Sequence, residues 1–295
     1  MTSIKTDFYR DWIDMLSQVL SSQGYTLPSS TSDNDISNMY FNLHNRLIEP
    51  KPRVVLRSQE FQCPAGYENA INELITRIAV GEDLTPFLSK KLKDLSYNDD
   101  LINDWDIYHL HLGRVLEPAG EFIVRSGPVL KARFDDDHAY FINIYQHNNW
   151  TKQEMIQIIN DNWPESIAAF KLSSDISLLH VPTDSDIKVA RDGHVNTMIQ
   201  LPTGEVYSPI GGGLTSSGIG FRVVRATQYH HKKILLMEEN FSISFQAAYQ
   251  VAPENVKAFF TQANDITFKL FVINGQFIAI EPISGFEVDL GPVRN

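Results

Sequence analysis

Apolar and polar residues alternate through DIYHLHLG (106–113), VLKARF (129–134) and HAYFINIYQH (138–147). Successive side chains of a strand point to opposite faces, so a period of two predicts β-strands. The last two stretches are separated by DDD (135–137), and aspartate favours turns. These segments therefore predict a small antiparallel sheet with a tight hairpin.

On the N-terminal side of these strands, apolar residues recur every three or four positions, which is the spacing of an amphipathic helix. Gly24 and Gly81 are suitable stops, and RVVLR (53–57) has the composition of a short strand. We expect helices over 8–20, 36–47, 67–80 and 86–95. The first hundred residues therefore form a helical lead.

On the C-terminal side, TKQEMIQIINDNWP (151–164) predicts a helix, with Thr151 as N-cap and Glu154 completing a capping box. Asn274-Gly275 is the strongest hairpin turn signal in the chain. Further helices are expected at ATQYHHKKILLMEENF (226–241) and PENVKAFFTQA (253–263). Short strands are expected at ISLLHV, IKVARDG, HVNTMIQL and GEVYSPI, which lie between 176 and 210.

A chain of 295 residues favours two domains. The change of pattern near 165–175 predicts a domain over 1–168 and a second over 169–295. The fold class is α+β: a helical N-terminal lead packed on a small antiparallel sheet, then a second α+β module with β-hairpins.

The composition limits the classes of function. A net charge of −11 argues against a general nucleic-acid coat, although one local basic site remains compatible with it. Cys63 is the only cysteine, which excludes an intramolecular disulfide and a multi-cysteine zinc site. The sequence has neither an apolar run of about 18 residues nor a signal-peptide core. We therefore expect a soluble cytoplasmic protein with no membrane association.

Residue parity assigns a polar face to the predicted sheet. If the three strands are neighbours, the face that we expect to point toward solvent carries His109, His111, Lys131, Arg133, Tyr145 and His147. Histidine supplies a general acid or base near neutral pH, and lysine or arginine stabilises a developing phosphate charge. Tyrosine stacks on an unpaired base or donates a proton. This set fits RNA cleavage by attack of the 2′-hydroxyl.

The order of a helical lead, the strands WDIYHLHLG, VLKARF and AYFINIYQH, and a following helix resembles the RelE-like (barnase/colicin/RelE-type) ribonuclease toxin superfamily. The resemblance covers residues 101–150 and implies a metal-independent endoribonuclease of toxin or phage-defence type. It places His109 and His111 as base and acid, Arg133 and Lys131 as phosphate stabilisers, and His147 and Tyr145 as support. His109-Leu110-His111 stands where many of those toxins carry an Arg-x-Arg pair, and the usual basic C-terminal run is absent.

Two alternatives remain open. His109 and His111 suit a zinc or manganese site in a metal-dependent hydrolase or nuclease. Asp104, Asp106, His138 and His147 are the candidates to complete its shell, with Asp104 and His147 preferred. A non-enzymatic binding or regulatory protein, whose polar sheet face serves solubility alone, is the other alternative. Under the ribonuclease hypothesis, residues 169–295 are expected to bind a protein partner, to mediate self-association into a homo-oligomer, or to restrain the nuclease.

The segment GGGLTSSGIG (211–220) lacks both the P-loop ending and the dinucleotide-binding spacing. We therefore expect a surface loop there and not a phosphate cradle.

Overall fold

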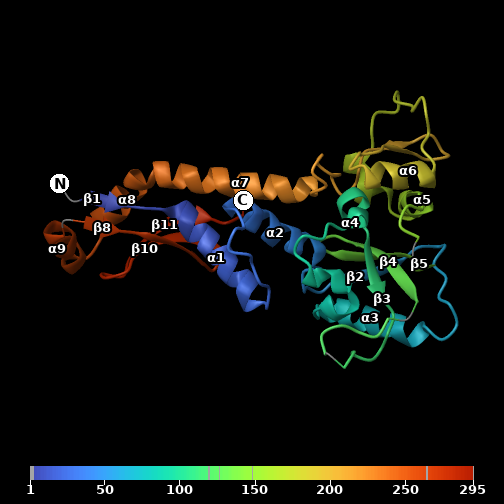
Figure 1. Ribbon diagram of the computed structural model, residues 1–295, viewed down its shortest axis with the longest axis horizontal. Helices are drawn as coiled ribbons and strands as arrows, with labels where there is room; N and C mark the ends of the chain where they lie inside the picture. Colours follow the sequence, from blue (N-terminus) through green and yellow to red (C-terminus); the bar gives the residue numbers. More distant parts are fainter. Residues whose placement is uncertain (1–2, 119, 126, 148, 264, 295) are drawn as a thin grey trace. The chain divides into compact units, whose positions relative to one another are not determined.

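The structure is a computed structural model that describes residues 3–118, 120–125, 127–147, 149–263 and 265–294. It is a mixed α+β protein with small sheets, as predicted (Figure 1). The chain divides into two compact units: unit 1 contains residues 1–40 and 225–295, and unit 2 contains residues 41–224. This division differs from the expected boundary at 168, which lies inside unit 2.

Unit 2 holds the predicted central strands. They are β3 (Tyr108–His111), β4 (Pro128–Phe134) and β5 (His138–Gln146), and they pair antiparallel as expected. β2 (Val54–Arg57) pairs parallel to β5 and completes the order β2-β5-β4-β3, so the sheet is mixed. Asp135 confirms the predicted turn, because its Oδ1 accepts hydrogen bonds from the backbone N–H groups of Asp137 and His138.

The register places paired residues on one face. His109 lies opposite Lys131, and Lys131 lies opposite Asn143. The register between β4 and β5 then shifts, so that Phe141 pairs with Ala132. This β-bulge inserts one residue into β5, so the β5 residues before the bulge point to the face opposite to the one that strict alternation predicts. Phe141 and Asn143 therefore lie on opposite faces, although strict alternation would place them on the same face, whereas the predicted common face of His109 and Lys131 is confirmed.

The helices of unit 2 partly follow the sequence pattern. They are α3 (Glu68–Val80), α4 (Asp100–Trp105), α5 (Glu154–Asn162) and α6 (Asp184–Asp192), with the 3₁₀ helices η1 (Thr85–Phe87), η2 (Lys90–Lys93) and η3 (Pro164–Phe170). The helix expected over 86–95 is replaced by η1 and η2. The strand expected at IKVARDG is the helix α6, because Thr183 and Asp186 form a capping box ahead of it. α5 begins at Glu154 without a side-chain cap, so the predicted cap at Thr151 is wrong.

One hydrophobic core explains why unit 2 continues past residue 168. It joins Ile107 and Ile142 of the sheet region to Ile156 and Ile159 of α5, and then to Ile187 of α6. The core extends into the segment of β6 (Ile199–Gln200) and β7 (Val206–Tyr207), where Tyr207 is buried. Cutting the chain at 168 would divide this core.

The glycine-rich segment 211–220 packs against α4. The N–H of Gly211 donates to the carbonyl of Asp104, and the N–H of Gly213 donates to the carbonyl of Asn103. A Cβ at Gly211 would overlap the backbone carbonyl oxygen of Ile102. These glycines therefore permit close backbone contact with α4, and their N–H groups donate hydrogen bonds to its carbonyls.

Unit 1 combines both ends of the sequence. Its helices are α1 (Phe8–Ser22), the start of α2 (Asp33–Arg46), most of α7 (Phe221–Glu239), α8 (Phe241–Gln250) and α9 (Glu254–Gln262). Its strands are β1 (Ser3–Lys5), β8 (Asp265–Thr267), β9 (Lys269–Ile273), β10 (Gln276–Glu281) and β11 (Phe286–Pro292). β1 pairs parallel to β8, and β9, β10 and β11 form an antiparallel meander.

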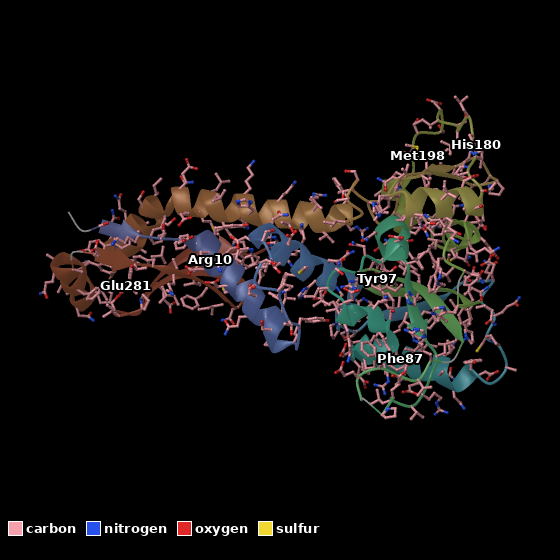
Figure 2. All side chains as sticks on the ribbon, in the orientation of Figure 1. Arg10, Phe87, Tyr97, His180, Met198 and Glu281 are labelled. Carbon is pink, nitrogen blue, oxygen red and sulfur yellow. The ribbon has the colours of Figure 1, made fainter. Side chains whose placement is uncertain are left out.

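Local contacts in unit 1 confirm the predicted hairpin. Asn274 and Gly275 both have positive φ, at 50° and 75°, as a tight turn between β9 and β10 requires. The phenyl ring of Phe241 lies 5.1 Å from that of Phe8 and 4.9 Å from that of Phe268, which joins α8 to the N-terminal helix and the strand region. Glu281, labelled in Figure 2, ends β10, and its carboxylate accepts hydrogen bonds from the backbone of Ile283 and Ser284.

Among the helices that the structure describes, none has the length and apolar character needed to cross a bilayer.

Candidate functional site

Three of the predicted histidines meet above the sheet of unit 2. The ring centroids of His109 and His111 are 5.9 Å apart, and those of His111 and His147 are also 5.9 Å apart. The indole of Trp150 lies 4.8 Å from the ring of His109 and 5.1 Å from that of His147. Lys131 places its Nζ 3.5 Å from the centroid of the same indole. We call these five residues the histidine cluster.

Three of the five residues of the histidine cluster are buried and the other two, His147 and Trp150, are half-buried, so the prediction that this face points toward solvent is wrong. His109 is 8% exposed, His111 is 3% exposed and Lys131 is 0% exposed. The segment after β5 returns over the sheet and places Trp150 against Lys131. The alternation of the strands could not distinguish a wet polar face from a covered one.

Arg133 and Tyr145 make their own contacts. The Nε of Arg133 lies 3.3 Å from the Oδ2 of Asp106, whose other carboxylate oxygen bonds Arg222 at 2.7 Å. Asp106 has positive φ and ends α4, so these ion pairs hold the turn that leads into β3. Tyr145 packs against the hydrophobic core of unit 2, and burial raises the pKa of its hydroxyl. Both side chains therefore have structural contacts that the sequence pattern did not suggest.

Asp99 joins the cluster from the start of α4. Its Oδ1 caps the helix by accepting the N–H groups of Leu101 and Ile102, and its Oδ2 lies 3.9 Å from the Nδ1 of His109. Asparagine and aspartate are common N-caps, but the contact with His109 spans ten residues of chain and depends on the fold.

Burial controls the protonation of the cluster. Desolvation lowers the pKa of His111 to about 4, and the nearby charges of Arg125 and His147 act in the same direction. Desolvation and then Lys131 lower the pKa of His109 well below its ordinary value. Both imidazoles are therefore neutral near neutral pH, and a neutral imidazole can accept a proton.

Lys131 is also driven toward its neutral form. Burial lowers the pKa of its amine well below 10.5, and Asp99 opposes this only in part. The face of Trp150 favours an ammonium by up to about 2 kcal/mol, whereas removing an ion from water costs several kcal/mol. The larger effect is desolvation. Among the residues described, no group hydrogen-bonds to the Nζ of Lys131.

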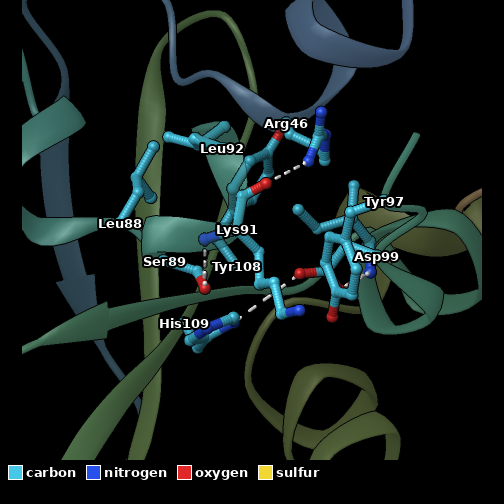
Figure 3. Close-up of a pocket in the computed structure, with 10 residues that line it drawn as sticks. Arg46, Leu88, Ser89, Lys91, Leu92, Tyr97, Asp99, Tyr108 and His109 are labelled. Atoms are coloured by element: carbon cyan, nitrogen blue, oxygen red, sulfur yellow. Dashed lines mark hydrogen bonds and ion pairs between the residues drawn. The ribbon is translucent and has the colours of Figure 1, made fainter. Parts of the chain in front are cut away.

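A cavity of about 540 Å³ opens beside the cluster. His109, His147 and Trp150 line it, and so do Tyr97 and the cations Lys91, Arg125, Lys188 and Arg191. The acidic residues Asp99, Asp100 and Asp192 also reach its wall. Figure 3 shows a smaller cavity of about 20 Å³ that shares Tyr97, Asp99 and His109 with the larger one, and a dashed line marks the contact between Asp99 and His109.

Arg191 ties α6 to this wall. Its Nε donates to the Oδ2 of Asp104 at 2.8 Å, and one terminal nitrogen donates to the backbone carbonyl of Trp150 at 2.6 Å. Its guanidinium carbon lies 4.2 Å from the centroid of the Trp105 ring. Asp104 is therefore paired with Arg191, whereas the zinc or manganese alternative expected it to bind a metal ion together with the histidines. Within the described ranges, no three His, Cys, Asp or Glu side chains are arranged to hold one metal ion.

Sequence reasoning missed Asp99, Arg125, Trp150 and the basic residues of α6. Arg125 and Trp150 both lie outside the alternating strands. α6 was interpreted as a strand, which hid the spacing of Lys188 and Arg191 on one helix. No family model, curated protein or solved structure matches the chain, so its function is inferred from the geometry of this site.

Proposed function

We propose that the chain is a cytoplasmic endoribonuclease of toxin or phage-defence type, which cleaves RNA without a metal in the cavity beside His109. The observation that carries the proposal is the meeting of the buried imidazole of His109 and the half-buried imidazole of His147 with cations and an indole at one cavity of about 540 Å³. RNA cleavage of this type needs a base, an acid and positive charge near the phosphate. The lining provides residues for all three tasks.

His109 is the proposed general base. It lines the cavity, and in the described part of the chain its Nδ1 has no hydrogen-bond partner. Asp99 lies 3.9 Å from that nitrogen and would orient the ring once the ring accepts a proton. The base removes the proton of the ribose 2′-hydroxyl, and the resulting oxygen attacks the adjacent phosphorus. The products are a 2′,3′-cyclic phosphate and a chain with a free 5′-hydroxyl.

His147 is the proposed general acid, because it is the other histidine on the cavity wall. It gives a proton to the leaving 5′-oxygen. His111 contacts the rings of both His109 and His147 and is a positioning residue. Arg125 lines the cavity and is exposed, and we assign to it the phosphate stabilisation that the sequence pattern assigned to Lys131 and Arg133.

The proposal is tested with a short fluorescent single-stranded RNA in the presence of a chelator. We expect His109→Gln to lower the cleavage rate at least about 10²-fold, which is the usual contribution of a general base. Arg125→Gln should lower it by about 10²-fold through loss of phosphate stabilisation. Because burial lowers the pKa of His109, its imidazole should still be unprotonated and able to act as the base below pH 6.5, the ordinary pKa of histidine.

Two matched controls lie on the same unit. His138→Gln removes a histidine from the far end of β5, where it faces Asp135 at 3.5 Å. Arg114→Gln removes a cation from the β3–β4 connection, where its Nε lies 3.7 Å from Glu73. Both should keep wild-type cleavage. Cleavage that persists in folded His109→Gln, or that requires added zinc or manganese, contradicts the proposal.

The binding of a protein partner by residues 169–295, and self-association, stay predictions from the sequence.

A further inference from the structure

The size of the cavity restricts what enters it. Its volume of about 540 Å³ falls within the range of small-ligand pockets, about 300–1,000 Å³. Paired or stacked bases of a duplex are too large for such an enclosure. A single nucleotide that has left its neighbours is of the right size.

The lining is suited to the base of a nucleotide. Tyr97 and Trp150 both line the cavity. Any of the nucleic-acid bases can stack on an aromatic side chain. Burial raises the pKa of Tyr97 to about 12, so its hydroxyl keeps its proton and the ring carries no negative charge. Lys91 lies beside this ring, with its Nζ 5.4 Å from the centroid.

The lining is also suited to a phosphate. Arg125 is close enough to His109 and His111 for its charge to lower the pKa of both imidazoles. Burial raises the pKa of the Asp99 carboxyl and of the Asp100 carboxyl.

We infer that the cavity binds one nucleotide at a time, with its base against Tyr97 and Trp150 and its phosphate beside Arg125 and His109. This inference rests on the proposed function for its biological meaning and narrows the substrate to unpaired RNA. A free nucleoside monophosphate should bind in the same place, because a single nucleotide carries all the groups that the cavity recognises.

The test measures binding to the full chain by calorimetry at low salt, with adenosine 3′-monophosphate as the probe. Adenosine, ribose 5-phosphate and inorganic phosphate are the matched ligands that lack one of the two groups. We expect saturable binding of the nucleotide, and binding at least about tenfold weaker for each of the others. Tyr97→Leu should weaken nucleotide binding about tenfold, whereas Tyr97→Phe should not.

Arg125→Gln provides the second arm. It should weaken the nucleotide about tenfold and leave adenosine unchanged, while Arg114→Gln should change neither. Equal affinity for the nucleotide and inorganic phosphate would show a simple anion site and overturn the inference. So would nucleotide binding that is unaffected by both Tyr97→Leu and Arg125→Gln.

The outcome separates this inference from the ribonuclease proposal. RNA cleavage without nucleotide binding overturns the one-nucleotide site and keeps the ribonuclease. Nucleotide binding without cleavage keeps the site and overturns the ribonuclease.

Discussion

Replacing Lys131 by methionine should remove a pH dependence from the stability of the protein. The amine of Lys131 is 0% exposed, and burial lowers its pKa well below the value of 10.5 that it has in an unfolded chain. Between these two pKa values the unfolded state binds one more proton than the folded state. The free energy of unfolding therefore rises with pH across this window.

The size of the effect follows from the single proton. One proton contributes about 1.36 kcal/mol for each pH unit, so the free energy of unfolding can rise by up to about 2.7 kcal/mol between about pH 7 and about pH 9. Lys131→Met has no proton to lose and should lack this contribution. Methionine has a similar length and no charge to desolvate, so the variant should be more stable than the wild type at pH 7.

Urea unfolding followed by tryptophan fluorescence is a suitable assay. Trp105, Trp150 and Trp163 belong to unit 2 and Trp12 to unit 1, so a Trp12→Phe background confines the signal to the unit that holds Lys131. The ordinary pKa of tyrosine lies at about 10, so the tyrosines contribute little below pH 9. Parallel pH profiles for the two proteins would refute the reasoning, because they would mean that Lys131 keeps its proton in the folded state.

Three further predictions concern packing and buried charge, and each is measured as a free energy of unfolding. Gly211→Ala should destabilise the protein by more than about 2 kcal/mol, since its Cβ would meet a carbonyl of α4, whereas Gly193→Ala has ordinary contacts and should be tolerated. Arg191→Met should cost about 3–5 kcal/mol, because it leaves the buried carboxylate of Asp104 without its partner; a loss below about 1 kcal/mol would contradict the buried ion pair. Glu281→Gln should lower the free energy of unfolding by about 1–3 kcal/mol at pH values above the pKa of the carboxyl, and by little below that pKa. Hydrogen bonds from the Ser284 side chain and the nearby backbone outweigh desolvation and lower the pKa of Glu281. The stabilisation from its carboxylate is therefore present at neutral pH and is lost as the pH falls through this pKa.

Local patterns predicted much of the secondary structure. The alternation of residues in 106–113 and 129–134 correctly indicated β3 and β4, because a strand shows its period in a few consecutive residues. Asn274-Gly275 correctly indicated a hairpin, because the two residues adopt the positive φ that the turn needs. IKVARDG failed because a run of only seven residues fits either period, and the capping box that favours a helix lies partly before it.

Long-range contacts set the limits of prediction for the site. Parity placed His109 and His111 on one face, but the burial of that face depends on Trp150, which follows the sheet and returns over it. The contact between Asp99 and His109, and the link from Arg191 to Asp104, join segments with no shared local pattern. The bulge in β5 also could not be predicted, since an inserted residue leaves no clear mark on the apolar alternation.

The composition of unit 1 from residues 1–40 and 225–295 has a consequence during synthesis. β1 cannot pair until the ribosome has made β8, and Phe8 must wait for Phe241. The insert that carries the catalytic candidates is translated in full before then. The nascent chain can therefore fold unit 2, with its candidate site, while the N-terminal helix is still without its partners.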